Sequence, residues 1–287
     1  MDWPPDPATW PLAEHSRQVA VTPHRWHVQE MGTGPDLLLL HGAGGAVHSW
    51  RGLMPLLARH YRVIAVDLPG HGFTRSPHGA RSGLEAMTQD LGRLIASQGW
   101  HPVAVIGHSA GGALALRLAQ RLDPPPKVVG LNPALTPFDG VAGWLFPMLA
   151  KMLALTPLSP VLFTLGNGGT RKARKLIEAT GSRLDDAGYA LYARLIGDRR
   201  HVNGVLQMMA RWDLAPLLED LPRIDAPTLF IAGLRDRAVA PAVSDRAAAR
   251  MPDARALPLD GLGHLAHEED PEQVAGIITG FLEAAPE

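Results

Sequence analysis

Short apolar runs alternate with longer segments of helical periodicity along most of this sequence. Runs that are apolar at nearly every position and rich in Val, Ile and Leu are typical of strands buried on both faces of a parallel sheet. Such runs cover 36–40, 61–66, 103–106, 127–131, 228–232 and 256–259. The intervening sequence predicts helices over 50–60, 84–98, 110–121, 241–251 and 271–284. This alternation is the pattern of an α/β fold.

The N-terminal part of the predicted sheet has a different pattern. Residues 19–21 and 25–30 alternate as paired strands should, with Thr22-Pro23-His24 as the turn between them. Strands joined by so short a turn are antiparallel. We therefore expect an α/β fold with a mostly parallel eight-stranded sheet, flanked by helices, that begins with an antiparallel pair.

The alternation stops between residues 134 and 222. This stretch contains the apolar segment 143–165, then the basic cluster Arg171-Lys172-Ala173-Arg174-Lys175, then amphipathic segments. Three prolines and a lysine interrupt the apolar segment, so short helices over an apolar pocket fit it better than a transmembrane helix. Because apolar and basic residues are close in sequence, we keep peripheral contact with a membrane as an alternative hypothesis.

These patterns predict three parts of the chain. We expect an extended Pro-rich arm over 1–18, an α/β core made of 19–133 and 223–287, and a helical cap inserted over 134–222. Trp3 and Trp10 of the arm are expected to pack on the core. The arm lacks the basic start and apolar stretch of a secretory signal.

Composition narrows the classes of function. The 287 residues are 46% hydrophobic, enough for a large core. The formal net charge of −1 disfavours a nucleic-acid partner, which requires a concentrated basic face. The absence of cysteine excludes disulfides, thiolate nucleophiles and cysteine-based metal sites. A cytoplasmic location is consistent with these features.

The sequence Gly107-His108-Ser109-Ala110-Gly111 lies between an apolar run and a long run of helix formers. A strand that turns abruptly into a helix at Gly-x-Ser-x-Gly holds the serine in a strained turn, with its hydroxyl exposed at a helix N-terminus. The flanking glycines allow the strand and the helix to approach closely. Ser109 is therefore the candidate nucleophile; the alternative is a buried serine in a tight turn.

A serine hydroxyl needs a base within hydrogen-bonding reach and a carboxylate that orients the base. Asp236 and His264 each come just after a predicted strand and follow Ser109 in chain order, so they are the candidate acid and base. Asp260 remains a rival acid and His267 a rival base. The other acidic candidates fit the strand ends less well: Asp139, Asp213 and Asp225.

Acyl transfer also needs donors for the oxyanion, and backbone amides at Ala43 and Ala110 are the candidates. Ala110 follows the nucleophile, and Ala43 lies in the loop His41-Gly42-Ala43-Gly44-Gly45. We expect five residues to line the substrate pocket: His41, His108, Trp144, Phe146 and Met148.

The sequence contains no clear motif for a metal or nucleotide site. The sequence His264-Leu265-Ala266-His267-Glu268 does not match a zinc-binding motif, and the loop 42–45 lacks the Gly-Lys-Ser/Thr ending of a P-loop. We therefore expect no metal and no cofactor.

Several motifs together resemble the α/β-hydrolase superfamily over nearly the whole chain. They are His41-Gly42, Asp67-Leu68-Pro69-Gly70-His71-Gly72, the Ser109 motif, 233–236 and Gly263-His264. The resemblance implies that fold and a Ser-His-Asp triad. Aspartate stands at the nucleophile position in epoxide hydrolases and haloalkane dehalogenases, so Ser109 disfavours both.

Further stretches resemble a narrower family, the magnesium chelatase accessory proteins of bacteriochlorophyll biosynthesis. They are Ser16-Arg17, Trp26-His27-Val28-Gln29, His48-Ser49-Trp50-Arg51, His71-Gly72-Phe73-Thr74 and 128–140. The resemblance implies a phototrophic bacterium, a Mg-porphyrin as the possible ligand and magnesium chelatase as a possible partner. Two hypotheses follow: a serine hydrolase acting on a carboxylic ester of an apolar molecule, and a non-catalytic porphyrin-binding protein. Other acyl and C–C bond hydrolyses that use the same triad stay open.

Overall fold

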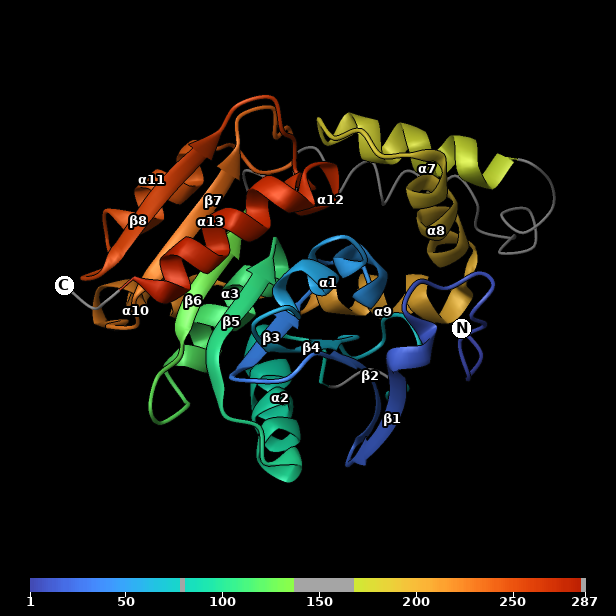
Figure 1. Cartoon of the computed structure of the whole chain (residues 1–287), viewed down its shortest axis with the longest axis horizontal. Coiled ribbons are helices and arrows are strands. Elements are labelled where there is room, and N and C mark those ends of the chain that lie inside the picture. Colours follow the sequence, from blue (N-terminus) through green and yellow to red (C-terminus); the bar gives the residue numbers. More distant parts are fainter. Residues whose placement is uncertain (78–80, 137–167, 285–287) are drawn as a thin grey trace.

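The computed structural model describes residues 1–77, 81–136 and 168–284. These residues form one eight-stranded sheet with helices on both faces (Figure 1). The strand order is β1-β2-β4-β3-β5-β6-β7-β8. The pairs β1–β2 and β2–β4 are antiparallel, whereas all other pairs are parallel. The predicted fold class, with its antiparallel start, is confirmed.

The strands agree closely with the apolar runs. In chain order they are β1 (Ser16–Val21), β2 (His24–Met31), β3 (Asp36–Leu40), β4 (Arg62–Val66), β5 (Pro102–His108), β6 (Lys127–Leu131), β7 (Thr228–Gly233) and β8 (Ala254–Leu259).

The helices lie on the two faces of the sheet and between β6 and β7. They are α1 (Leu53–Leu57), α2 (Leu84–Gln98), α3 (Ala110–Ala119), α7 (Gly168–Ala179), α8 (Asp186–Gly197), α9 (Arg199–Ala210), α10 (Ala215–Asp220), α11 (Ala242–Ala248), α12 (Ala266–Glu269) and α13 (Pro271–Glu283). Three short 3-10 helices occur in the described residues: η1 (Ala13–His15), η2 (Val47–Trp50) and η3 (Leu221–Arg223).

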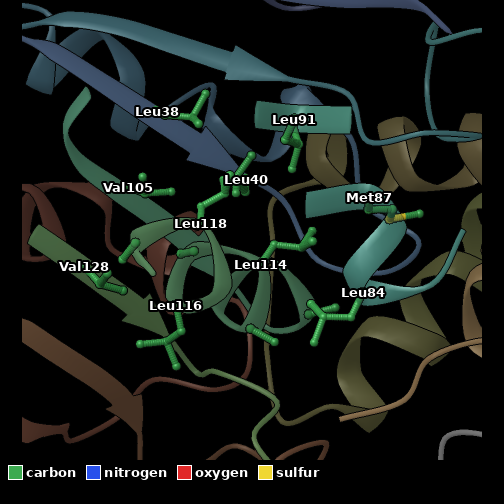
Figure 2. Close-up of a cluster of buried hydrophobic side chains, with 14 of the residues drawn as sticks. Leu38, Leu40, Leu84, Met87, Leu91, Val105, Leu114, Leu116, Leu118 and Val128 are labelled. Carbon is green, nitrogen blue, oxygen red and sulfur yellow. The ribbon is translucent and has the colours of Figure 1, made fainter. Parts of the chain in front are cut away.

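The central strands bury alternate side chains in two separate cores. Leu38 and Leu40 of β3 face a cluster that includes α2 and α3 (Figure 2), whereas Leu37 and Leu39 face a cluster that includes α1 and α13. All four leucines have no exposed surface. Because side chains alternate between the faces of a strand, an uninterrupted apolar run requires helices on both faces of the sheet.

The helix predicted over 50–60 is much shorter in the structure. The chain forms the 3-10 turn η2 and then α1, which spans only Leu53–Leu57. Pro55 lies in the first turn of α1, where its missing N–H is tolerated, but it could not lie in the middle of a helix that began at Trp50. Gly52 precedes α1 and packs against Pro271, since an added Cβ would lie 2.9 Å from the Pro271 Cγ.

The N-terminal segment packs on the core, as predicted from its tryptophans. Trp10 is 1% exposed, and its ring lies 5.0 Å from that of Phe73. Trp3 packs against the same apolar cluster. The segment is not extended throughout, because it contains turns and η1, and β1 begins at Ser16, inside the range expected for the arm.

The region predicted as a cap, between β6 and β7 in the chain, contains three amphipathic helices, α7 to α9. Figure 1 shows α7 beside the loop that follows β7, and α9 near the N-terminal segment. Trp144, Phe146 and Met148, which we expected to line the pocket, lie outside the described residues. Within the parts of the chain that the structure describes, no helix is long and apolar enough to cross a bilayer.

Candidate active site

Ser109 occupies a sharp turn between β5 and α3. Its backbone has φ 51° and ψ −115°, a conformation that costs a non-glycine residue about 1–3 kcal/mol. The flanking glycines allow the turn, because a Cβ on Gly107 would lie 2.1 Å from the Gly111 carbonyl oxygen and one on Gly111 would lie 2.1 Å from that of Leu40. The strand-turn-helix context expected for a serine nucleophile is thus present.

Asp236 and His264 meet at the ends of β7 and β8. His264 Nδ1 lies 2.7 Å from Asp236 Oδ2. A carboxylate only accepts, so Nδ1 donates, and in the neutral ring Nε2 is then the unprotonated acceptor. This tautomer is the one that a general base for a serine hydroxyl requires.

The Asp236 carboxylate is fixed by three further donors. Its Oδ1 accepts from the amides of Ala238 and Val239 at 2.7 and 2.8 Å, and its Oδ2 accepts from Asn132 Nδ2 at 2.8 Å. The carboxylate has no exposed surface. Asn132 was not predicted as a site residue, although its place directly after β6, at the same edge of the sheet, was a signal.

Four of the five rival candidates are among the described residues. Asp260, Asp213 and Asp225 are exposed, and Asp139 is outside the described residues. His267 has no exposed surface and packs between Trp50 and His108, with tilted rings whose centroids are 4.7 and 4.6 Å away.

Ser109 is half-buried at its turn. Among the described residues, no hydrogen bond joins its hydroxyl to His264. Nucleophile and base are often further apart before substrate binds. The two residues are connected through His108, whose ring lies 4.8 Å from that of His264.

The loop 41–45 lies against Ser109, the candidate nucleophile. A Cβ on Gly42 would lie 3.0 Å from the Ser109 Cβ and 2.8 Å from His108 Nδ1. The Ala43 and Ala110 amides have no hydrogen-bond acceptor among the described residues. Ala43 is exposed, and Ala110 is the first residue of α3, where a backbone amide has no acceptor within the helix.

His41 and His108 are buried beneath the loops around Ser109. His41 Nδ1 donates to the Gly42 carbonyl at 2.8 Å, and its Nε2 accepts from the Leu68 amide at 2.9 Å. Burial lowers the pKa of His41, so the ring is neutral near pH 7. With no exposed surface and both nitrogens bonded, His41 shapes the loop and does not line a pocket as we expected.

Helix α9 holds the same loop from the other side. His201 Nε2 donates to the Gly44 carbonyl at 3.2 Å, and its Nδ1 accepts from the Gly72 amide at 3.1 Å. This contact was not predicted, because no sequence signal connects a histidine on a helix to a loop more than 150 residues away. In the described parts of the chain, no cluster of three or more His, Asp or Glu side chains is arranged to hold a metal ion.

Comparison with known proteins shows the family to which this chain belongs. Residues 35–271 match the family described as alpha/beta hydrolase fold. The chain is 47% identical over 280 residues to the magnesium-chelatase 30 kDa subunit of Rhodobacter capsulatus, which covers 96% of this chain and 98% of that protein. The narrower resemblance drawn from the sequence is thus confirmed.

One further relative and one solved structure are named as esterases. The pimeloyl-[acyl-carrier protein] methyl ester esterase of Xanthomonas campestris pv. campestris is 34% identical over 276 residues, covering 91% of this chain and all of that protein. The solved structure of an esterase from Exiguobacterium antarcticum has a TM-score of 0.75 with 17% identity, covering 91% of this chain and 96% of that one. The second likeness concerns the fold alone.

Proposed function

This chain belongs to the alpha/beta hydrolase fold family, and we propose that it is a serine hydrolase that cleaves a carboxylic ester of an apolar substrate. The hydrogen bond between His264 and the fully buried Asp236, at the sheet edge where Ser109 has its strained turn, is the observation that carries this proposal. It supplies the oriented base that an ordinary serine hydroxyl needs.

In the proposed reaction, Ser109 Oγ attacks the ester carbonyl carbon and its proton moves to His264 Nε2. The Ala43 and Ala110 amides stabilise the tetrahedral oxyanion, and Asp236 stabilises the imidazolium. Collapse breaks the ester C–O bond, and His264 gives the proton to the leaving alcohol. Water then attacks the acyl group, again with His264 as base, releasing a carboxylic acid and restoring Ser109.

We place the substrate in the Mg-porphyrin branch of bacteriochlorophyll biosynthesis. The support is the 47% identity to a protein named as a magnesium-chelatase subunit. Mg-porphyrins are apolar plates with carboxyl or ester edges, and an ester edge suits the proposed reaction. A cytoplasmic protein, in at most peripheral contact with the membrane, would meet both chelatase and pigment.

A second candidate function is a non-catalytic one. Since the same relative is named as a subunit of magnesium chelatase, this chain could bind a porphyrin and assist that enzyme without chemistry. The esterase name of the second relative favours catalysis. The buried hydrogen bonds that orient His264 favour it too.

One experiment separates the two functions. The wild-type protein and Ser109→Ala are treated with a fluorophosphonate, with and without Mg-protoporphyrin monomethyl ester, and the intact mass is measured. We expect one adduct on the wild-type protein, none on Ser109→Ala, and suppression of the adduct by the porphyrin. Porphyrin binding without any adduct would support the accessory role and overturn the hydrolase.

A further inference from the structure

The segment Thr180-Gly181-Ser182, directly after α7, lies between the loop that carries Asp236 and the loop that carries His264. On the Asp236 side, the Arg237 amide donates to the Thr180 carbonyl at 3.0 Å. Gly181 has φ +90°, and a Cβ there would lie 1.8 Å from the Arg235 carbonyl oxygen. Backbone therefore packs directly on backbone at this side.

On the His264 side, the contact is equally close. The Leu265 amide donates to Ser182 Oγ at 2.8 Å, and Ser182 has no exposed surface. A Cβ on Gly263 would lie 2.4 Å from the Gly181 carbonyl carbon and 2.6 Å from the Ser182 nitrogen. The residues on both sides of His264 are thus in contact with the 180–182 segment.

Glu269 also links the loop that carries His264 to the residues that follow α7. Its Oε1 accepts from the Gly263 amide at 2.8 Å and its Oε2 accepts from the Arg183 amide at 3.2 Å. The Glu269 side chain is 6% exposed. Charge-assisted hydrogen bonds of a nearly buried carboxylate are stronger than those between neutral groups. The loop of the base is therefore held to the helical region by two independent polar contacts.

We propose that Ser182 is a positioning residue for His264, and that the 180–182 segment makes the helical region between β6 and β7 part of the catalytic geometry. This inference rests on the proposed hydrolase function. Leu265 directly follows His264, so losing its acceptor frees the backbone that aims the imidazole. Because a misplacement of about 1 Å can cost about a hundredfold in rate, the effect falls on turnover more than on substrate binding.

The test compares Ser182→Ala with a matched variant, Ser82→Ala. Ser82 is also buried, and its hydroxyl donates to the Gln207 carbonyl of α9 at 3.0 Å, so its removal breaks one bond to the helical region away from Asp236 and His264. For Ser182→Ala we expect kcat to fall by about ten- to a hundredfold with KM nearly unchanged. Ser82→Ala should keep the wild-type kcat. Ser182→Cys, whose sulfur is larger than the hydroxyl oxygen but still a weak acceptor, should be intermediate.

A second measurement does not depend on turnover. The proton on His264 Nδ1, hydrogen bonded to Asp236, should give a strongly downfield resonance in proton NMR. We expect Ser182→Ala to shift or broaden it and Ser82→Ala to leave it unchanged. Wild-type kcat and an unshifted resonance in Ser182→Ala, or equal losses in both variants, would overturn the positioning role. If the wild-type protein cleaves no ester, the hydrolase proposal fails, and the resonance still decides the role of Ser182.

Discussion

His108 Nε2 donates a hydrogen bond to the backbone carbonyl oxygen of His264 at 2.9 Å. The residue before the candidate nucleophile therefore holds the loop of the candidate base. Burial lowers the pKa of His108 well below its ordinary value, and the neighbouring His267 and His264 act in the same direction. The ring is neutral near pH 7, and because a carbonyl only accepts, its proton is on Nε2.

Replacing His108 tests this connection. His108→Leu removes the donor and should lower kcat by about tenfold, which corresponds to about 1.4 kcal/mol of the barrier. His108→Gln retains an N–H that can reach the carbonyl and should lose less. Steady-state kinetics on a chromogenic ester give kcat and KM for both. Equal losses in the two variants would mean that ring packing matters and the hydrogen bond does not.

A second Ser-His-Asp arrangement in the molecule serves as an internal comparison. Ser16 Oγ lies 3.0 Å from His27 Nε2, and His27 Nδ1 lies 2.6 Å from Asp67 Oδ2. The hydrogen-bond pattern is that of a triad, but Ser16 begins the edge strand β1 and has no helix N-terminus behind it. Its oxygen already accepts from Gln29 Nε2 at 3.2 Å.

We therefore expect a fluorophosphonate to label Ser109 and not Ser16. Peptide mapping of the labelled protein locates the adduct. Ser16→Ala should label like the wild-type protein and lose about 1 kcal/mol of stability, the typical net contribution of a hydrogen bond. An adduct at Ser16 in the Ser109→Ala protein would show that the hydrogen-bonded array suffices for reactivity without the strained turn.

Gly42→Ala tests the loop that presents the Ala43 amide. An added Cβ would meet His108 Nδ1 at 2.8 Å and the Ser109 Cβ at 3.0 Å, so the loop must shift. Loss of one oxyanion donor typically costs about a hundred- to a thousandfold in kcat, and we expect a loss in that range. Gly92→Ala, in α2 with no atom near the added Cβ, is the control. It should keep full activity and gain about 0.5–1 kcal/mol of stability.

His201 gives stability a pH dependence. Burial lowers the pKa of His201 to about 4, and His41 adds to the effect. The unfolded chain takes up this proton near pH 6.5 and the folded protein only near pH 4. The contribution of His201 to the free energy of unfolding is therefore full above about pH 6.5 and falls by about 3 kcal/mol toward pH 4. Urea unfolding of His201→Gln between these pH values should show a smaller decline. Replacing the exposed His60 by Gln should leave the decline unchanged.

The sequence alone was sufficient where local pattern decides the structure. The bounds of β3, α2 and β6 agree with the prediction, because an apolar run or a periodic segment ends where the element ends. Asp236 and His264 were expected near each other because parallel strands end at one edge of a sheet, and they are hydrogen bonded. The chain order of nucleophile, acid and base came from the resemblance to α/β-hydrolases. The prediction of a helix over 50–60 was wrong, because it rested on helical periodicity and neglected the position of Pro55.

The supports of the site could not be predicted from the sequence. Asn132, Ser182 and His201 act through contacts with segments distant in sequence, and a single buried polar residue has no periodic pattern that reveals its partner. Burial also changes what a residue can do. His41 was expected to contact substrate, but it is enclosed by the loop that it shapes.

Helix α8 is attached to the core through a buried carboxylate. Glu268, which has no exposed side-chain surface, forms an ion pair with Arg51 and accepts from Tyr192 Oη of α8 at 2.6 Å. Burial raises the pKa of Glu268, and Arg51 offsets part of that effect. The stability that this raised pKa contributes is thus full below about pH 4.5. It is lost as pH rises through the pKa that Glu268 has in the folded protein.

Arg51→Leu should therefore destabilise the protein most at high pH. Removing the cation leaves a buried, unpaired carboxylate, which costs about 3–5 kcal/mol. The deficit should shrink as pH falls, because protonation neutralises Glu268. Urea unfolding at pH 5 and pH 8 measures the deficit, and Tyr192→Phe, which removes only a hydrogen bond, should cost less at both values. Adding Glu268→Gln to Arg51→Leu should restore part of the stability at pH 8. A deficit that is equal at both pH values and unchanged in the double variant would mean that Arg51 acts through packing, and the charge of Glu268 would have no part in holding α8.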